Sequence, residues 1–279
     1  MTPDVSAVVP RLRIERRRAW SVADLRELWA YRELLYFFVW RDLKVRYKQT
    51  VLGVAWALLQ PVASMVVFWL FFGKLAHVPS DGLPYPLFSL AGLVPWTYFA
   101  TALSGGSNAL VGSQALISRV YFPRLLIPLG AVVTPLVDFA ISFVLVAGLM
   151  AWYGAPVHVT LLALPLLLVL LVSAAAAASS WLAALQAQYR DVRYLVPFVT
   201  QFWLFVTPVV YPASLVPAKW RALYGLNPLA GIITGIRWTL FGGPMDLSLL
   251  TVSVVTIAAA LVSGYLYFHR LERTLADVV

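Results

Sequence analysis

The sequence predicts an all-α integral membrane protein with six transmembrane helices, and two observations carry this prediction. The first is composition: 61% of the 279 residues are hydrophobic, only 12% are charged, and the mean hydropathy is +0.82. Water-soluble domains of this size do not have such a composition. The second is that the apolar residues gather in six segments of roughly 20 residues, the length that a helix needs to cross a bilayer.

The region before the first apolar segment is basic. Residues 1–20 contain five arginines and are expected to form a loosely ordered cytoplasmic tail beside anionic lipid. Ser21 and Asp24 have the spacing of a capping box, so a helix should begin near Val22. Apolar residues then recur at helical spacing, and charged residues take the other positions. Residues 21–50 are therefore predicted to form an amphipathic helix in the inner membrane interface.

The six predicted spans follow this helix. Their prolines are expected to kink or delimit the helices, and neighbouring groups should bond the carbonyls that proline frees. The small residues at 173–180 should let a neighbouring helix approach closely. The predicted spans are 54–75, 87–111, 126–152, 161–185, 195–211 and 247–268, and the prolines in question are Pro61, Pro135, Pro165, Pro197 and Pro208.

The basic residues predict the orientation. With six spans, 17 of the 21 Lys and Arg residues fall on the side of the N-terminal region, and only four fall on the other side. The positive-inside rule therefore places both termini in the cytoplasm. The net charge of +9 follows this topology and does not indicate nucleic-acid binding. The chain has no cysteine, which excludes disulfides and cysteine-based metal sites.

The connection between spans two and three is unusual for a cytoplasmic loop. Residues 113–124 are basic but also contain Leu116, Ile117, Val120 and Tyr121. These apolar side chains favour a short surface helix that ends at Pro123 and that a partner or the headgroup layer covers. The alternative is a simple basic connector.

The connection between spans five and six is expected on the outer side, yet it is apolar. Asn227 and Pro228 are a good helix start, and the Gly242-Gly243-Pro244 run should stop the helix. The segment between them is too short to span a bilayer. Residues 213–243 are therefore predicted to form an outer re-entrant or interfacial helical hairpin, and an amphipathic helix resting on lipid is the alternative.

A catalytic constellation is not found in the sequence. No phosphate-binding loop is present, because Gly73-Lys74-Leu75 lacks the hydroxyl and the preceding glycine. The three histidines are far apart, so no metal site is indicated. Asp138 is the only ionisable residue well inside a predicted span. It is expected to have a hydrogen-bonded structural role or to lie near a span end, with proton coupling as the alternative.

Aromatic faces are more informative. Phe198, Phe202 and Phe205 lie at helical spacing on one face of span five. Aromatic rings beside amides would suit sugars, which present both C–H faces and hydroxyls, although an interfacial belt and plain helix packing are the alternatives. The candidate lining residues are Gln60, Ser64, Phe68, Trp69 and Phe72 on span one and Phe198, Gln201, Phe202 and Phe205 on span five.

Four blocks of sequence, in order and over nearly the whole chain, carry a resemblance to a known family. They are WRDLKVRYKQTVLGVAWALLQP at 40–61, LISRVYFPRLLIPL at 116–129, YRDVRYLVPFVTQFWLFVTPVVYP at 189–212 and NPLAGIITGIRWTLFG at 227–242. Together they resemble the permease subunit of ABC-2 type polysaccharide exporters, the transporters of O-antigen, teichoic acid and capsule.

The resemblance implies a half-transporter of the ABC-2 (type V) exporter class. A second copy of the chain and two copies of a separate ABC ATPase would complete it. ATP and magnesium would belong to the ATPase, and this chain would hold neither cofactor nor metal. Residues 21–50 would be a gate helix. The coupling helix would be 113–124, with Ser118, Arg119, Val120, Tyr121, Phe122 and Arg124. The periplasmic gate would include Trp220, Asn227, Pro228, Ile232, Ile236 and Arg237.

The implied cargo is a polyprenyl-diphosphate-linked polysaccharide, with O-antigen first and teichoic acid, capsule or another lipid-linked glycan as alternatives. It would cross a bacterial inner membrane through a channel between spans one and five of opposite copies. A secondary carrier should show internal repeats and intramembrane charges, which this sequence lacks. The diphosphate would meet basic residues at the cytoplasmic mouth: Arg41, Lys44, Arg46 and Lys48.

Overall fold

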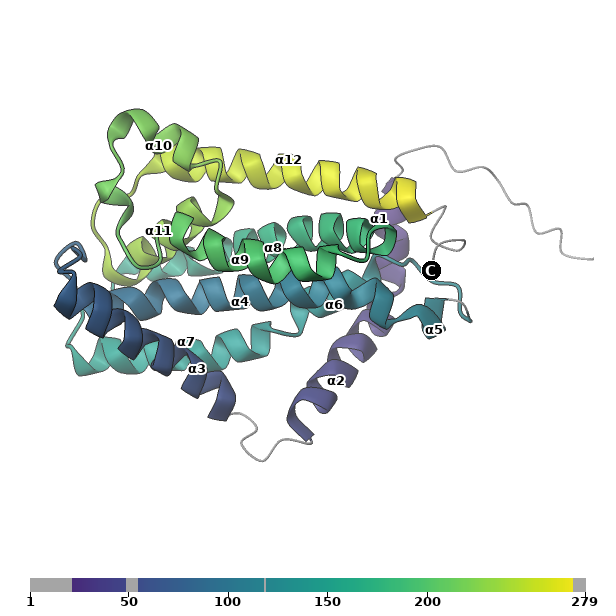
Figure 1. Cartoon of the computed structure of the whole chain (residues 1–279), viewed down its shortest axis with the longest axis horizontal. Coiled ribbons are helices and arrows are strands. Elements are labelled where there is room, and N and C mark those ends of the chain that lie inside the picture. Colours follow the sequence, from purple (N-terminus) through teal and green to yellow (C-terminus); the bar gives the residue numbers. More distant parts are fainter. Residues whose placement is uncertain (1–21, 49–54, 118, 273–279) are drawn as a thin grey trace, which may run out of the picture.

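The structure is a computed structural model that describes residues 22–48, 55–117 and 119–272. Every regular element in these ranges is helical (Figure 1). The tail at 1–20, the proposed cap at Ser21, residue Ser118 and residues 273–279 lie outside the described residues. The prediction of an all-α membrane fold is confirmed.

The elements follow in chain order. They are α1 (Val22–Ala30), α2 (Arg32–Lys48), α3 (Ala55–Phe68), the π-helix η1 (Trp69–Leu75), α4 (Tyr85–Gly112), α5 (Gln114–Ile117), α6 (Leu126–Val133), α7 (Leu136–Trp152), the 3-10 helix η2 (Val159–Ala163), α8 (Leu164–Gln188), α9 (Val192–Val206), the 3-10 helix η3 (Ala213–Leu215), α10 (Ala218–Tyr224), α11 (Pro228–Phe241) and α12 (Leu247–Glu272).

The long helix α4 forms the centre of the bundle. It packs against α3, α6, α7, α8, α9 and α11 (Figure 1). Of its most apolar stretch, 78% is buried inside the chain, against 6% for α3 with η1. The first span therefore lies at the outside of the bundle and keeps most of its surface for lipid or for another protein chain.

Among the residues that the structure describes, five helical segments are long and apolar enough to cross a membrane, and they match predicted spans one, two, three, four and six. They run over Ala55–Leu75, Tyr85–Gly112, Leu126–Trp152, Val159–Gln188 and Leu247–Leu271. With the apolar composition, they make the chain a multi-pass membrane protein.

The fifth predicted span is shorter than expected. The sequence predicted 195–211, but α9 ends at Val206 and has 15 residues, which rise only about 22 Å. The cause is local. Pro208 disfavours helical geometry in the residue before it, and Thr207 is extended, with φ −95° and ψ 143°.

Prolines shape the other spans as the sequence predicted. Pro135 separates α6 from α7. Pro61 lies inside α3, where it cannot donate to the carbonyl of Ala57. The hydroxyl of Ser142 on α7 donates to this carbonyl at 2.9 Å. A neighbouring helix thus satisfies the group that the proline frees, as a membrane interior requires.

Small residues bring α4 and α8 together. The space beside Gly106 on α4 is filled by Ser179 of α8, since a Cβ atom at position 106 would lie 2.4 Å from the Ser179 Cβ. The Ser179 hydroxyl also donates to the carbonyl of Ala102 at 3.2 Å. The predicted close-packing role of 173–180 is confirmed.

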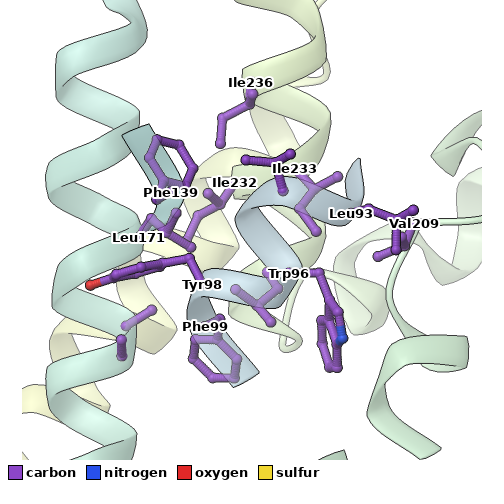
Figure 2. Packing of buried hydrophobic residues seen from close by; sticks show 14 of the residues in the cluster. Leu93, Trp96, Tyr98, Phe99, Phe139, Leu171, Val209, Ile232, Ile233 and Ile236 are labelled. Atoms are coloured by element: carbon purple, nitrogen blue, oxygen red, sulfur yellow. The ribbon is translucent and has the colours of Figure 1, made fainter. Parts of the chain in front are cut away.

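Two hydrophobic clusters hold the bundle together. The larger one includes Leu93 and Phe99 of α4, Leu171 of α8, and Ile232 and Ile233 of α11 (Figure 2). The smaller cluster joins α2, the segment after α5, α8 and the end of α12. It includes Phe38, Leu110, Phe122, Leu126, Ile127 and Phe268.

The bundle has two distinct ends (Figure 1). The α5 end contains α1, α5 and the last turn of α12, and the α10 end contains the loop after η1, α10 and α11. Distant connections meet at the α10 end: the hydroxyl of Ser214 donates to Asp81 at 2.8 Å, and Arg221 pairs with Asp246 at 3.4 Å. Both ends of the segment 213–243 therefore lie at the α10 end.

Candidate functional site

The N-terminal segment that was predicted to be amphipathic is two helices. The sequence predicted one helix over 21–50, but a turn at Tyr31 separates α1 from α2. The helix α2 slants across the bundle and packs on α6 (Figure 1). Gly130 of α6 permits this approach, because a Cβ at that position would lie 3.2 Å from the Cβ of Phe38. The aromatic side chains of Tyr36, Phe37 and Trp40 remain exposed.

The last turn of α2 binds the intramembrane carboxylate. Arg46 forms an ion pair with Asp138 of α7, and the phenol of Tyr47 donates a hydrogen bond to the other carboxylate oxygen. Burial and then the bond to Asp138 raise the pKa of Tyr47 to about 12, so the phenol keeps its proton and acts as donor. The hydrogen-bonded role predicted for Asp138 agrees with these contacts. The basic partner of Asp138 comes from α2, outside the predicted spans.

Two adjoining cavities lie along α2. One of 510 Å³ separates α2 from α4 and α6 and is lined by Arg41, Arg46 and Asn108. The other, of 270 Å³, extends between α3, α4 and α7 and is lined by Gln60, Tyr98 and Asp138. Arg46 and Pro135 line both cavities. The basic side chain of Arg46 thus lies where the larger cavity meets the cavity inside the helix bundle.

The four predicted mouth residues divide into two groups. Arg41 lines the larger cavity beside Arg46, and it pairs with Asp42 at 2.9 Å. Lys44 lies over the ring of Trp40 with its Nζ 5.0 Å from the ring centre, and Lys48 is exposed at the last position of α2. The structure brings Arg41 and Arg46 together at the cavity and leaves the two lysines outside its lining.

The predicted coupling helix is only one turn long. The sequence predicted a helix over 113–124, but α5 ends at Ile117. Arg119 and Val120 are exposed, and Tyr121 is 81% exposed, whereas Phe122 is only 4% exposed. Residues 119–122 therefore form a loop in which Tyr121 faces away from the bundle and Phe122 is buried against it.

The anchor of this loop is a contact with α2. The ring of Phe122 meets the ring of Phe38 edge to face, with the ring centres 5.8 Å apart. Arg124 lies beyond it and is partly buried. Pressure on the exposed tip at Tyr121 would therefore reach α2 directly through Phe122.

The candidate lining residues of span one lie along α3 and η1. Gln60 faces the smaller cavity. Phe68 and Phe72 meet edge to face at 5.6 Å, and the ammonium of Lys74 lies 4.3 Å from the centre of the Trp69 ring. Ser64 is partly buried on the same helix.

Span five presents its aromatic face outward. Phe198, Phe202 and Phe205 are 60%, 59% and 50% exposed, and the first two rings lie 4.7 Å apart. Gln201 is exposed beside them, whereas Trp203 turns inward and packs on Phe99 at 5.3 Å. Within one copy, α3 packs on α4 and α7 and α9 packs on α4 and α8. A face formed by both spans therefore needs a second copy.

The predicted outer gate residues are not gathered on one surface. Trp220 is exposed on α10, whereas Ile232 and Ile236 of α11 are fully buried in the larger cluster. Asn227 caps α11, as predicted, by accepting from the backbone N–H of Leu229 at 3.2 Å, with Pro228 in the first turn. It also accepts from the indole of Trp203 and so ties α11 to α9.

Arg237 is a buried cation that sequence reasoning treated only as a gate residue. Its guanidinium donates to the carbonyls of Pro208 at 2.6 Å, Val209 at 2.7 Å and Phe88 at 3.0 Å. It also lies 3.5 Å from the centre of the Phe88 ring. Burial lowers the pKa of Arg237 to about 9, which still leaves it charged at pH 7. The side chain holds together α4, α11 and the segment after α9.

Some site residues were missed by the sequence reasoning. No role was predicted for Tyr47, Asn108 and Tyr98, which line the cavities along α2. A signal was available for Tyr47, because it follows Arg46 directly at the end of a basic helix and the third predicted span contains a lone carboxylate, Asp138. Asp81, Arg221 and Asp246 come together at the α10 end from the turn before α4, from α10 and from the segment before α12.

Comparison with known proteins identifies the family. The ABC-2 type transporter family matches residues 33–241. The chain is 32% identical to the O-antigen export system permease protein RfbA of Myxococcus xanthus, over 85% of this chain and 93% of that protein. It is 25% identical to a protein of the same name from Klebsiella pneumoniae, with 88% and 95% covered. It is 23% identical to the polysialic acid transport protein KpsM of Escherichia coli, with 85% and 93% covered. The chain therefore belongs to the ABC-2 type transporter family.

Proposed function

We propose that this chain is the channel-forming permease subunit of an ATP-driven exporter that moves a lipid-linked polysaccharide, O-antigen in the first instance, out of the cytoplasm. The observation that carries the proposal is similarity, over 85% of this chain, to named O-antigen and polysialic acid transport proteins, together with five long apolar helices in the described part of the chain. ATP would be hydrolysed by a separate ABC ATPase. The exposed tip at Arg119 and Tyr121 is the surface that would receive this partner.

A pair of permeases would form the channel in a bacterial inner membrane. The outward aromatic face of α9 and the largely exposed α3 are the two surfaces that a second copy would bring together. Rings that stack weakly and repeatedly on sugars would let a long glycan slide, whereas one tight site would hold it in place.

The aromatic face gives a direct test of the proposed function. Replacing Phe202 and Phe205 by Ala should lower glycan export by about tenfold or more, because each stacking contact contributes on the order of 1 kcal/mol. Export is measured as surface glycan in cells whose own copy of the permease is deleted. The matched control is Leu166 and Val169 to Ala on α8, which are similarly exposed. Equal export by both double variants, at equal protein levels, would contradict a channel along α9.

The cytoplasmic mouth would take the lipid diphosphate at Arg41 and Arg46, where the larger cavity meets the bundle. In the structure, the guanidinium of Arg46 is already paired with the carboxylate of Asp138. A diphosphate presents the same kind of acceptor oxygens with more charge, so it would displace Asp138 and free the last turn of α2. Asp138 would then act as a competitor that holds α2 in place until the substrate arrives.

This competition predicts the effect of neutralising Asp138. The variant Asp138→Asn should bind a short-chain polyprenyl diphosphate about fivefold more tightly, because the partly exposed pair contributes at most about 1 kcal/mol. The variant Arg46→Gln should bind it more weakly, and the double variant should bind as weakly as Arg46→Gln. Binding is measured on purified protein in nanodiscs. Weaker binding by Asp138→Asn would mean that the carboxylate organises the site instead of competing for it.

The finer topology is also part of this proposal: six spans, both termini in the cytoplasm and an outer hairpin formed by α10 and α11. Burial of α11 among α4, α8 and α12 supports a re-entrant helix over one that rests on lipid. Because α9 has only 15 residues, the segment 207–211 would complete the fifth crossing.

Single cysteines can test this topology, because the native chain has none. Lys219→Cys and Pro244→Cys should react with an impermeant maleimide added from outside, and Asp277→Cys should react only after permeabilisation. Position 244 is preferred to Gly243, whose φ of +90° would strain a cysteine. Labelling of position 244 only from the cytoplasmic side would refute the hairpin and the six-span topology.

A further inference from the structure

The side chain of Asn227 joins the first turn of α11 to the end of α9. Its Oδ1 accepts from the backbone N–H of Leu229 at 3.2 Å and from the indole N–H of Trp203 at 3.1 Å. Its Nδ2 donates to the Oγ1 of Thr207 at 3.0 Å and to the carbonyl of Val206 at 3.5 Å. An amide offers two donor and two acceptor positions, so all four are used. Three of the four partners belong to α9 or to the residue that follows it.

These bonds are the polar connection between α9 and the rest of the bundle. Among the residues that the structure describes, each side-chain hydrogen bond that links α9 to another helix ends on Asn227. The hydroxyl of Thr200, by contrast, donates at 2.6 Å to the carbonyl of Val196 within α9 itself. The helix also packs on α4 and α8, where Trp203 meets Phe99 edge to face at 5.3 Å.

The apolar side chains of α9 do not by themselves fix its rotation about its own axis. Val192 and Val196 on the inward side are buried, but the aromatic face on the opposite side is equally apolar. Lipid tails are as apolar as either side, so burial in a membrane distinguishes the possible rotations only weakly. A hydrogen bond is directional: the indole of Trp203 reaches Asn227 when Trp203 faces inward, and the aromatic face then points outward.

The turn that carries Asn227 is held in place by α12. The hydroxyl of Ser253 donates to the carbonyl of Gly225 at 3.1 Å and accepts from the backbone N–H of Gly231 at 3.2 Å. Ser253 is fully buried, and a Cβ atom at Gly231 would lie 2.5 Å from its Oγ, so the two backbones approach closely. Asn227 lies between these two glycines and is therefore a fixed point for α9.

We propose that Asn227 is a positioning residue of the exporter: through Trp203 and Thr207 it sets the rotation of α9 and keeps the aromatic face turned toward the glycan. This inference rests on the proposed function, which makes that face a wall of the channel, and it deepens that function by naming the residue that orients the wall. Because Asn227 begins α11, a displacement of the outer hairpin also displaces α9. The outer hairpin and the channel wall thus move together.

Two substitutions remove this connection and keep the neighbouring contacts. Asn227→Ser still caps α11, because serine is as good an N-cap as asparagine, but its shorter side chain does not reach Trp203. Trp203→Phe keeps a ring against Phe99 and loses the indole N–H. The matched control is Thr200→Val on the same helix, since the hydroxyl bond that it removes stays inside α9.

Thiol labelling of the full-length chain, purified in complex with its ATPase, reports the position of α9. The native chain has no cysteine, and three valines give matched sites. Val196→Cys lies on the inward side of α9 and is 3% exposed, whereas Val199→Cys lies on the outward side at 41%. Val209→Cys lies in the segment after α9 at 0% and reports on general loosening of this region. The rate of reaction with a maleimide is measured at each site.

Trp203→Phe should raise the ratio of the rate at position 196 to the rate at position 199 about fivefold, the effect of one lost hydrogen bond. Asn227→Ser should raise this ratio at least as much, and adding Trp203→Phe to it should cause no further change, because the bond is already absent. Thr200→Val should leave the ratio unchanged, and position 209 should stay unreactive in every variant. Glycan export by Trp203→Phe should fall about fivefold at equal levels of the complex.

The outcomes separate this inference from the proposed function. An unchanged ratio in Trp203→Phe and Asn227→Ser would overturn the positioning role, and so would a parallel rise at position 209, which would mean general loosening. A raised ratio with normal export by Trp203→Phe would overturn the claim that this orientation serves the glycan. Normal export by the Phe202 and Phe205 double variant would instead refute the channel wall itself, whatever the labelling shows.

Discussion

Replacing Arg237 by Ala should destabilise the folded chain by on the order of 3–5 kcal/mol, because the change leaves buried acceptors without donors. Three carbonyls, those of Phe88, Pro208 and Val209, accept hydrogen bonds from this guanidinium. The last two lie in the non-helical segment after α9, and the arginine side chain is only 8% exposed. Unfolding by sodium dodecyl sulfate in mixed micelles measures the free energy. Arg237→Lys should be intermediate, because an ammonium keeps the charge but loses the planar fork.

The control for this prediction is another arginine of the same hairpin. Arg221 forms a longer and partly exposed pair with Asp246, so Arg221→Ala should change stability by no more than about 1 kcal/mol. Similar unfolding curves for the two alanine variants would contradict a structural role for Arg237. The predicted gate role would then be the remaining function for Arg237.

Replacing Arg119 by Glu together with Tyr121 by Ala should abolish export and leave the permease inserted and folded. Both side chains are exposed at the tip of the loop after α5, so their loss removes no internal packing. Phe122 keeps the loop anchored against Phe38. The expected result is a loss of about a hundredfold in recovery of the partner ATPase with the permease, because aromatic and arginine anchors dominate interfaces of this kind.

The conservative pair Arg119→Lys and Tyr121→Phe is the control, since it preserves a charge and a ring. It should retain most of the recovered ATPase and of the export. If the Glu and Ala variant exported glycan at the normal level, the loop would be only a basic connector between two spans.

The sequence was sufficient for the class of fold because membrane helices are specified locally. Length, hydropathy and charge bias identified the long helices, and Pro135 and Asn227 mark helix ends by their own backbone chemistry. Pro208 shows the limit of this reasoning. It was recognised as a possible breaker, but only the extended conformation of Thr207 shows that α9 stops there.

The candidate site was harder to predict because its contacts join distant parts of the chain. Arg46 and Asp138 are 92 positions apart, and their pairing depends on the angle at which α2 crosses α6. Arg237 looked like an outward positive charge, but its surroundings come from α4 and from the broken end of α9. Spacing along one helix carries no information about such partners.

The contact between Phe38 and Phe122 has a thermodynamic consequence. The same helix, α2, touches the loop after α5, the proposed coupling loop, at Phe38 and lines the cavities at Arg46. If the position of α2 differs between two states, a headgroup that prefers one state changes the affinity of the permease for its ATPase by some factor. Linkage then requires the ATPase to change the affinity for that headgroup by the same factor. Binding of the lipid headgroup and binding of the ATPase would therefore influence each other before any ATP is hydrolysed.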